Sequence, residues 1–222
     1  TDVGRLGIRT GSITASADQV RVALTGRGGH TARPHLTGDL VYALGRVVTE
    51  LPAALGRRVD PRASLSVVWG RVVAGRVANA IPQEGEVEGT LRCLDRAAWQ
   101  VAPALVEELV QAIVAPYGVT ATVDYTRNVP PVENEATSID LLTRAVEATE
   151  GPDAVMTTEQ SLGGEDFAWY LDAVPGALAR LGVRRPHETA EIDLHQGLFD
   201  ADERAISVAA RVLVAAALLS FG

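Results

Sequence analysis

The stretch Glu86-Val-Glu-Gly-Thr-Leu-Arg-Cys-Leu-Asp95 joins an alternating segment to the start of a helical pattern. Small or apolar residues alternate with polar ones as far as Cys93, and this period of two predicts a half-buried β-strand. Asp95 precedes an apolar pattern of helical spacing, and aspartate is a favoured N-cap. We therefore predict a strand that ends near Cys93 and a helix from Asp95 to about Tyr117. Pro103 lies inside that helix, so we expect a kink or a late start.

Three further segments alternate in the same way, at residues 20–25, 64–69 and 119–126. Between the first two, apolar residues recur on one helical face from Leu40 to Leu51. The predicted order is β-α-β-β-α-β from about residue 15 to 127. Each strand has one apolar face, so two helices should cover one side of an antiparallel sheet. This is an α+β, ferredoxin-like arrangement.

The remaining chain begins with Asn128-Val-Pro-Pro-Val-Glu-Asn-Glu135, which we interpret as an extended linker. We expect next a helix capped by Thr137 and Asp140, then a turn at 163–166 that leads into a short helix. Residues 177–183 are apolar enough for a buried strand. So few strands do not complete a sheet layer, and we therefore expect this part to belong to a larger domain.

The last predicted helix follows Asp200 and Glu203, which resemble a capping box. Its apolar face is expected to consist of Ile206, Ala209, Leu213 and Ala217.

Composition excludes several classes of protein. The chain has 222 residues and a net charge of −8, which argues against nucleic acid as a partner. All 20 basic residues are arginine, so neither a Schiff-base lysine nor a phosphate-loop lysine is available. Cys93 is the single cysteine, which suggests a reducing, cytoplasmic location and a core residue. The longest apolar stretch is interrupted by Arg211 and is too short to span a membrane.

Two of the four histidines are candidates for chemistry. His30 follows Gly28-Gly29 at a strand end, where paired glycines allow positive φ and close backbone approach. His195 follows Asp193-Leu194 and could be a metal ligand supported by the acidic neighbour. A plain turn around His30 and a surface-loop position for His195 explain the same patterns. No complete site follows from the residues alone, because the spacings of ordinary metal, nucleotide and serine-hydrolase motifs are absent.

Five short segments together resemble the M20 metallopeptidase and amidohydrolase family, in its branch of hippurate hydrolases and N-acyl-amino-acid amidohydrolases. They occur in the family's order across nearly the whole chain. The segments are Gly26-Arg-Gly-Gly-His-Thr-Ala-Arg-Pro-His35, Gly75-Arg-Val-Ala-Asn-Ala-Ile-Pro82, Gly89-Thr-Leu-Arg92, Gly163-Gly-Glu-Asp-Phe167, and Leu194-His195 with Phe199 and Glu203.

The resemblance implies that the β-α-β-β-α-β segment is a lid and dimerisation domain inserted into an α/β zinc-peptidase-like domain. Residues 1–14 would then be a remnant of the catalytic domain, 15–127 the lid, and 128–222 the C-terminal half of the catalytic domain. It also implies a homodimer, and we expect an edge strand and a helix of the lid to form the contact.

The resemblance further implies roles for single residues. His30 would stabilise the oxyanion in the active site of the partner subunit. Asn79 and Arg92 would contact the substrate carboxylate or acyl region, for which an arginine fork is suited. His195 would be one ligand of a two-metal centre. An alternative for Arg92 is a cross-strand pair with Glu86 or Glu88.

Gly163 and Gly164 would form a tight turn that lines the pocket, while Glu165 and Asp166 could equally be helix caps. The family's other metal ligands and its general base precede the lid, and this chain contains none of them. We therefore expect a fragment that is inactive alone and that holds no metal stably. The intact enzyme would use two divalent ions (Zn, Mn, Co or Ni) to hydrolyse N-acyl amino acids, related small amides or dipeptides. The alternative is a non-catalytic ferredoxin-like module for dimerisation or small-ligand binding.

Overall fold

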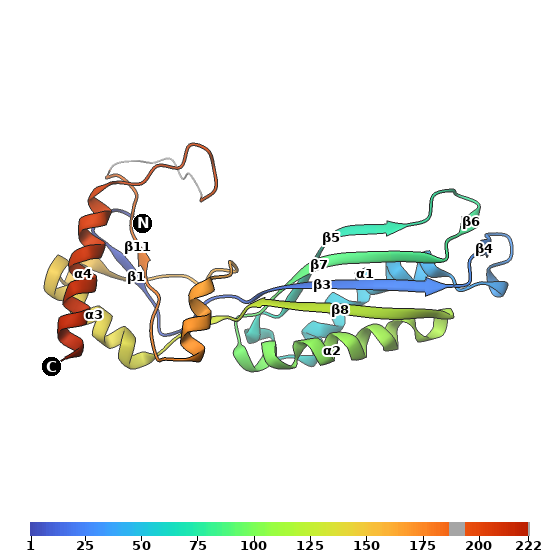
Figure 1. The fold of residues 1–222 in the computed structure, drawn as a ribbon, viewed down its shortest axis with the longest axis horizontal. Coiled ribbons are helices and arrows are strands. Elements are labelled where there is room, and N and C mark those ends of the chain that lie inside the picture. The colour runs from blue at the N-terminus through green and yellow to red at the C-terminus, as the bar shows by residue number, and fades with distance from the viewer. Residues whose placement is uncertain (187–193, 222) are drawn as a thin grey trace. The chain divides into compact units, whose positions relative to one another are not determined.

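The computed structural model describes residues 1–186 and 194–221. Contacts divide the chain into two compact units (Figure 1). Unit 1 comprises Thr1–Ile13, Val132–Ser161 and Trp169–Gly222. Unit 2 comprises Thr14–Pro131 and Leu162–Ala168. The fold is mixed α and β, as the sequence pattern predicts.

Unit 2 is built on an antiparallel sheet in the order β5-β7-β3-β8 (Figure 1). All four predicted strands are present. β5 begins after Ser64 rather than at it, because that residue adopts a left-handed conformation with φ of 51°. β5 also shifts register between Trp69 and Arg71. The strands are β3 (Ala17–Gly26), β5 (Ser66–Ala74), β7 (Glu84–Arg92) and β8 (Val119–Val129).

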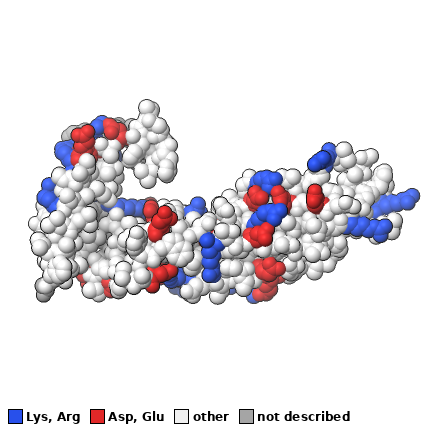
Figure 2. Space-filling view, viewed as in Figure 1, with Lys and Arg blue, Asp and Glu red and all other residues white. Residues whose placement is uncertain are grey.

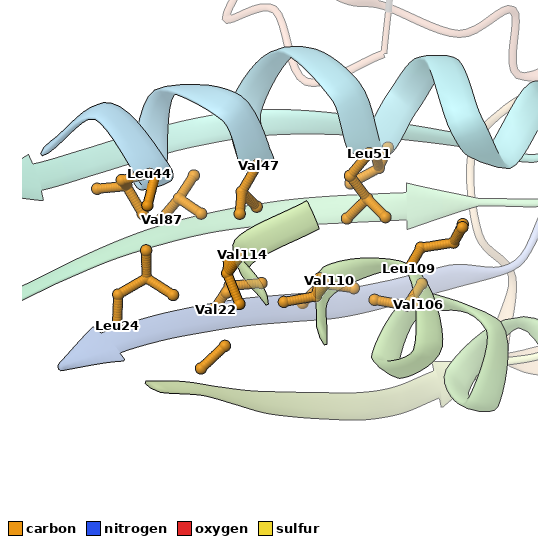
Figure 3. Close-up of a cluster of buried hydrophobic side chains, with 14 of the residues drawn as sticks. Val22, Leu24, Leu44, Val47, Leu51, Val87, Val106, Leu109, Val110 and Val114 are labelled. Atoms are coloured by element: carbon orange, nitrogen blue, oxygen red, sulfur yellow. The ribbon is translucent and has the colours of Figure 1, made fainter. Parts of the chain in front are cut away.

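Two helices cover one face of this sheet, α1 (Leu40–Arg58) and α2 (Arg96–Val114). α1 packs against β5 and β7, and α2 packs against β8. The core between helices and sheet is aliphatic, as Figure 3 shows. Fully buried members include Val22, Leu24, Leu44, Val47, Leu51, Val87, Val106 and Val110. Burial of such side chains, each worth roughly 1.5–3 kcal/mol, ties the helices to one side of the sheet.

The start of α2 confirms Asp95 as its N-cap, because its side chain accepts a hydrogen bond of 2.7 Å from the Ala98 amide. The expectation of a late start is wrong, since the helix begins at Arg96 despite Pro103 in its interior. Proline lacks the N–H that would bond the Trp99 carbonyl one turn earlier. Arg127 Nη2 donates to that carbonyl at 3.3 Å and supplies a substitute.

A buried carboxylate joins strands and helix at one end of unit 2. Asp18 is 1% exposed and accepts hydrogen bonds from Trp99 Nε1 and Tyr125 Oη, both at 2.7 Å. The Asn128 amide donates a third bond at 3.2 Å. Burial and the bond to Asp18 raise the pKa of Tyr125, so this phenol stays protonated and donates. The network fixes β8 against β3 and α2.

The opposite end of the sheet carries a short antiparallel ladder of β4 (Gly29–His30) with β6 (Ala80–Ile81) (Figure 1). Short 3-10 helices complete the connections of this unit. They are η1 (Pro34–Leu36), η2 (Pro61–Ala63) and η3 (Ala115–Tyr117).

Unit 1 contains a small sheet in the order β10-β1-β11. β1 (Leu6–Ile8) pairs in parallel with β10 (Val155–Thr157) and antiparallel with β11 (Arg180–Leu181). The strand predicted for 177–183 is thus reduced to two residues. The predicted linker also contains a strand, since β9 (Val132–Asn134) pairs with β2 (Gly11–Thr14).

The two helices of unit 1, α3 (Ala136–Glu150) and α4 (Arg204–Ser220), pack against each other. The predicted cap of α3 by Thr137 and Asp140 is wrong. Glu135 is the N-cap, and its longer carboxylate accepts from the amides of Thr137 at 2.9 Å and Ser138 at 2.6 Å. η4 (Pro152–Ala154) and η5 (Asp166–Asp172) are short 3-10 segments.

The predicted face and cap of α4 are also wrong. Ile206 and Leu213 are 74% and 66% exposed, whereas the buried side chains are those of Ala205, Val208 and Val212. Apolar residues surround most of this helix, so spacing alone does not identify the buried stripe. Instead of a capping box from Asp200, Asp202 Oδ1 accepts from the Arg204 amide at 3.0 Å. No helix of the described residues has the length and apolar character needed to cross a membrane.

Candidate functional site

His30 lies at the end of unit 2, where β4 runs beside β6 and pairs it with Ala80. The expected positive φ at the two preceding glycines is absent, but close approach is present. A Cβ on Gly28 would lie 2.6 Å from the Ile81 carbonyl oxygen, and one on Gly29 would lie 2.6 Å from Thr37 Cγ2. The glycine pair therefore lets β4 approach its neighbours and presents the exposed His30 side chain.

The imidazole of His30 is held in one hydrogen-bonding arrangement. The Ala32 amide donates to His30 Nδ1 at 3.0 Å. A nitrogen that accepts this bond cannot carry the proton of the neutral ring, so the proton resides on Nε2. Nε2–H is thus the donor that remains on the neutral His30 ring.

Asn79 is brought beside His30 by the same ladder. Its carbonyl accepts from the amide and the hydroxyl of Thr31, each at 3.3 Å. Its side-chain amide is exposed and forms no hydrogen bond within the described residues. His30 and Asn79 both line a groove of about 1200 Å³, together with Arg76 and Glu84.

Arg92 lies at the other end of β7 and is half-buried. It forms no ion pair with any described residue, so the cross-strand alternative for this residue is wrong. Glu86 and Glu88 are instead paired with Arg21 and Arg71.

These ion pairs form one network on the face of the sheet that the helices leave open, extended by a 2.7 Å contact from Arg21 to Asp124 (Figure 2). Hydrogen bonds from Arg71 and Arg21 lower the pKa of Glu86, so it remains a carboxylate. The acidic residues of β7 that lie closest to Arg92 in sequence are thus paired with other arginines.

Gly163 and Gly164 belong to the segment Leu162–Ala168, which is part of unit 2. A Cβ on Gly164 would lie 2.7 Å from both Ala17 Cβ and Val129 Cγ2, and 3.7 Å from Arg92 Nη1. Only glycine permits this approach, and it brings the turn to Arg92. Asp166 then lies in the first turn of η5. The structure thus places Arg92 and Gly164 together, and His30 and Asn79 together.

The two pairs lie at opposite ends of the sheet. β7 contains nine residues, so its ends are about 26 Å apart, and His30 lies beyond the end at Glu84. An N-acyl amino acid is about two residues long and spans about 7 Å. His30 and Arg92 of one chain therefore lie too far apart to hold the same substrate of that size.

The described arginines of unit 2 differ in whether their guanidinium groups have a partner. Most of its described arginines bind a carboxylate or a carbonyl, as Arg58 binds Glu108 at 2.8 Å. Those whose guanidinium groups have neither partner within the described residues are Arg27, Arg33, Arg76 and Arg92. Figure 2 shows basic side chains at the end of the unit where β3 finishes. Arg76 is a residue that sequence reasoning missed, although it lies within the motif that contains Asn79.

His195 belongs to unit 1 and has a φ of 70°, a left-handed conformation that is uncommon outside glycine. It is exposed, and Asp193, its expected support, lies outside the described residues. The described residues contain no group of three or more His, Cys, Asp or Glu side chains that could hold a metal ion. By themselves they therefore do not fit a two-metal centre.

Sequence comparison finds that the model of peptidase family M20/M25/M40 matches residues 3–219. A protein of Rhodococcus jostii (strain RHA1) whose name reads "Putative glutamate--cysteine ligase 2-3" is 48% identical over 214 residues, which cover 96% of this chain and 27% of that protein. The N-acetylcysteine deacetylase of Bacillus subtilis (strain 168) is 31% identical over 217 residues, covering 98% of this chain and 55% of the deacetylase.

Structure comparison gives the same result. A Bacillus subtilis protein described as a dinuclear metal-binding peptidase from the M20 family superposes with a TM-score of 0.79 and 27% identity. The match covers 99% of this chain and 54% of that one. The chain thus spans about half the length of this structure and of the deacetylase, and about a quarter of the Rhodococcus relative.

Proposed function

The chain belongs to peptidase family M20/M25/M40, and we propose that the complete protein containing it hydrolyses the amide bond of N-acyl amino acids, related small amides or dipeptides. The name of the deacetylase relative supports this class of substrate. The observation that carries the proposal is the groove that His30 and Asn79 both line, since the Nε2–H of His30 and the side-chain amide of Asn79 have no hydrogen-bond partner within the described residues. Such donors suit the oxyanion that forms during amide hydrolysis.

Unit 2 is proposed to be a ferredoxin-like lid at about residues 15–127, with 1–14 and 128–222 belonging to a catalytic domain. Support comes from the strand order β5-β7-β3-β8, with the two helices on one face. The first strand of the β-α-β-β-α-β unit lies between the third and the fourth, as a ferredoxin-like sheet requires.

The separation of His30 from Arg92 supports an active site that two chains share. We place Arg92 and Gly164 against the substrate of their own chain, where the arginine fork binds the carboxylate. His30 and Asn79 then act on the substrate of the partner subunit. Loss of an oxyanion donor costs about 10²–10³ in kcat, which is the contribution assigned to His30.

The dimer contact is proposed at the edge strand β5 and the neighbouring α1. β5 is an edge of the sheet and carries exposed Val68, Val72 and Val73, while α1 exposes Val41 and Tyr42. An apolar edge strand favours pairing with a second copy. Light scattering should report a dimer for the 222-residue chain and a monomer for Val72→Glu.

Val101→Glu is the matched control for the dimer, since Val101 is as exposed but lies on α2. This variant should remain dimeric. A monomeric parent chain, or a dimer that survives Val72→Glu, would exclude this contact.

The metal requirement is proposed for the complete protein. His195 offers one imidazole, and we assign the other ligands to residues outside the described part of this chain or outside the chain itself. Zn, Mn, Co and Ni all accept such nitrogen and oxygen ligands, and the bound ions would polarise the amide carbonyl and activate water. The 222-residue chain alone is accordingly proposed to be inactive.

Steady-state kinetics of the complete gene product on a panel of N-acetyl amino acids tests the activity. His30→Ala should lower kcat about 10²–10³-fold with little change in KM. His35→Ala is the control, because His35 is exposed in η1 and does not line the groove. Absence of hydrolysis in the parent protein would instead favour the non-catalytic module, and equal effects of both variants would remove His30 from the reaction.

A further inference from the structure

The groove that contains His30 and Asn79 is lined by one ion pair, between Arg21 and Glu86, and by two further opposite charges, Arg76 and Glu84. Arg76 follows Gly75, whose φ of 68° turns the chain out of β5, and Glu84 begins β7. Both side chains are exposed, and neither forms an ion pair or a side-chain hydrogen bond within the described residues. They line one groove but do not satisfy each other.

The next charged residues along β5 and β7, by contrast, do form ion pairs. Arg71 binds Glu86 and Glu88 on the open face of the sheet. The chain also has 28 acidic residues for 20 basic ones, so acidic partners are in excess. A cation and an anion that line one groove without pairing leave both charges available to a third molecule.

We propose that this groove is a specificity subsite for the part of the substrate remote from its scissile amide, and that it selects a group bearing both a carboxylate and an ammonium. This inference rests on the proposed function, since it takes His30 as the residue at the reacting carbonyl. Arg76 binds the carboxylate, for which its planar fork is suited, and Glu84 accepts hydrogen bonds from the ammonium.

The pair of charges explains why a zwitterion is favoured over simpler groups. A substrate with a carboxylate alone meets Arg76 but is repelled by Glu84, and one with an ammonium alone meets the reverse. A hydrocarbon end leaves both charges without a partner in the complex. Specificity here arises from repulsion of the wrong end groups as much as from attraction of the right one.

The test uses the complete gene product and four N-acetyl amino acids of equal chain length. All share the scissile amide and the α-carboxylate, and their side chains end in an amino-carboxylate, a carboxylate, an ammonium or a methyl group. We expect the amino-carboxylate substrate to have a kcat/KM at least about tenfold above the other three, as expected for charge-assisted hydrogen bonds.

Two variants divide this preference between the charges. Arg76→Ala should lower kcat/KM about tenfold for the amino-carboxylate and carboxylate substrates and leave the methyl substrate unchanged. Glu84→Gln should lower it for the amino-carboxylate and ammonium substrates. Arg33→Ala is the matched control, since Arg33 is equally exposed and unpaired within the described residues but does not line the groove. It should change none of the four.

The possible outcomes distinguish failure of the subsite from failure of the proposed amidohydrolase function. Hydrolysis of all four substrates at equal kcat/KM overturns the subsite and leaves the amidohydrolase proposal standing. An equal loss on all four substrates in Arg76→Ala also overturns it, because Arg76 would then act without regard to the end group. Hydrolysis of none overturns the proposed function and the subsite with it.

Discussion

Gly164 lies so close to two strands that there is no room for a side chain at this position. Its Cα approaches β3 and β8 so closely that a Cβ would lie 2.7 Å from Ala17 Cβ and Val129 Cγ2. Gly164→Ala should therefore push the turn away from Arg92 and cost about 1–3 kcal/mol of unfolding free energy. Urea unfolding of the 222-residue chain measures this cost.

Gly45→Ala is the matched control for that substitution. Gly45 lies within α1, and a Cβ there meets nothing within 4 Å. The same change should stabilise by about 0.5–1 kcal/mol, because alanine favours helix. Equal effects of the two substitutions would show that the turn has room at Gly164.

Glu135 makes the stability of unit 1 dependent on pH. Hydrogen bonds from Ser138 and Thr137 hold its pKa at about 2, below the usual range of a glutamate. A carboxyl whose pKa is lowered by folding stabilises the native state above the unfolded pKa, near 4.3, and loses this contribution as the pH falls toward 2. Its benefit should thus be complete at pH 6 and disappear between about pH 4 and pH 2.

The comparison with Glu135→Gln isolates this residue, because Asp202, whose pKa is also about 2, is present in both proteins. The difference in unfolding free energy between parent and variant should shrink as the solution is acidified. A difference that stays constant from pH 6 to pH 2 would contradict the assigned cap.

Single residues of the candidate site could be proposed from the sequence only where a motif contains them. His30, Asn79 and Arg92 were proposed from short motifs, whereas the proton position on His30 depends on a hydrogen bond from Ala32 that no pattern reveals. Arg76 was missed because an exposed arginine in a turn has no signature. Arg76 becomes a candidate only because it lines the groove and has no partner within the described residues.

At the scale of elements, α2 accommodates an interior proline because a side chain of β8 donates a hydrogen bond to the carbonyl that the proline leaves without its helical partner. Arg127 on β8 donates to the Trp99 carbonyl at 3.3 Å and to the Gln100 carbonyl at 2.7 Å, and lies 4.5 Å from the Trp99 ring centroid. Arg127→Ala should cost about 1–2 kcal/mol of unfolding free energy. In a Pro103→Ala background the cost should be smaller, because the restored amide bonds the Trp99 carbonyl.

A double-mutant cycle by urea unfolding checks whether the Arg127 hydrogen bond replaces the one that Pro103 cannot donate. Additive effects of Arg127→Ala and Pro103→Ala would contradict it, since the two changes would then act independently.

Strict alternation was a reliable guide to the strands of unit 2, because one face of each packs on helices and the other meets water. The same reasoning failed for α4, which is apolar on most of its surface. The cap of α3 was wrong for a different reason: it was predicted from the usual capping residue types, whereas Glu135 reaches the two amides with a longer side chain. Periodicity identifies an element when its two faces differ, and it cannot orient one whose faces are alike.

At the scale of the whole molecule, the sequence predicted the β-α-β-β-α-β order of unit 2 but not the small sheet of unit 1. Strands β1, β10 and β11 have at most three residues each, too short for a pattern. They depend on pairing between segments about 150 to 175 residues apart along the chain, which only the folded structure brings together.

The central claim is that two chains share each active site, since one sheet separates His30 from Arg92 by more than the length of the substrate. Mixing the His30→Ala and Arg92→Ala variants of the complete protein and allowing subunits to exchange tests it directly. Half of the dimers become hybrids, and each hybrid has one site with an intact Arg92 from one chain and an intact His30 from the other. Hydrolysis by the mixture should therefore recover to about a quarter of the parent rate, although each variant alone is nearly inactive. A mixture no more active than its two components would show that both residues act within a single chain and would contradict the account.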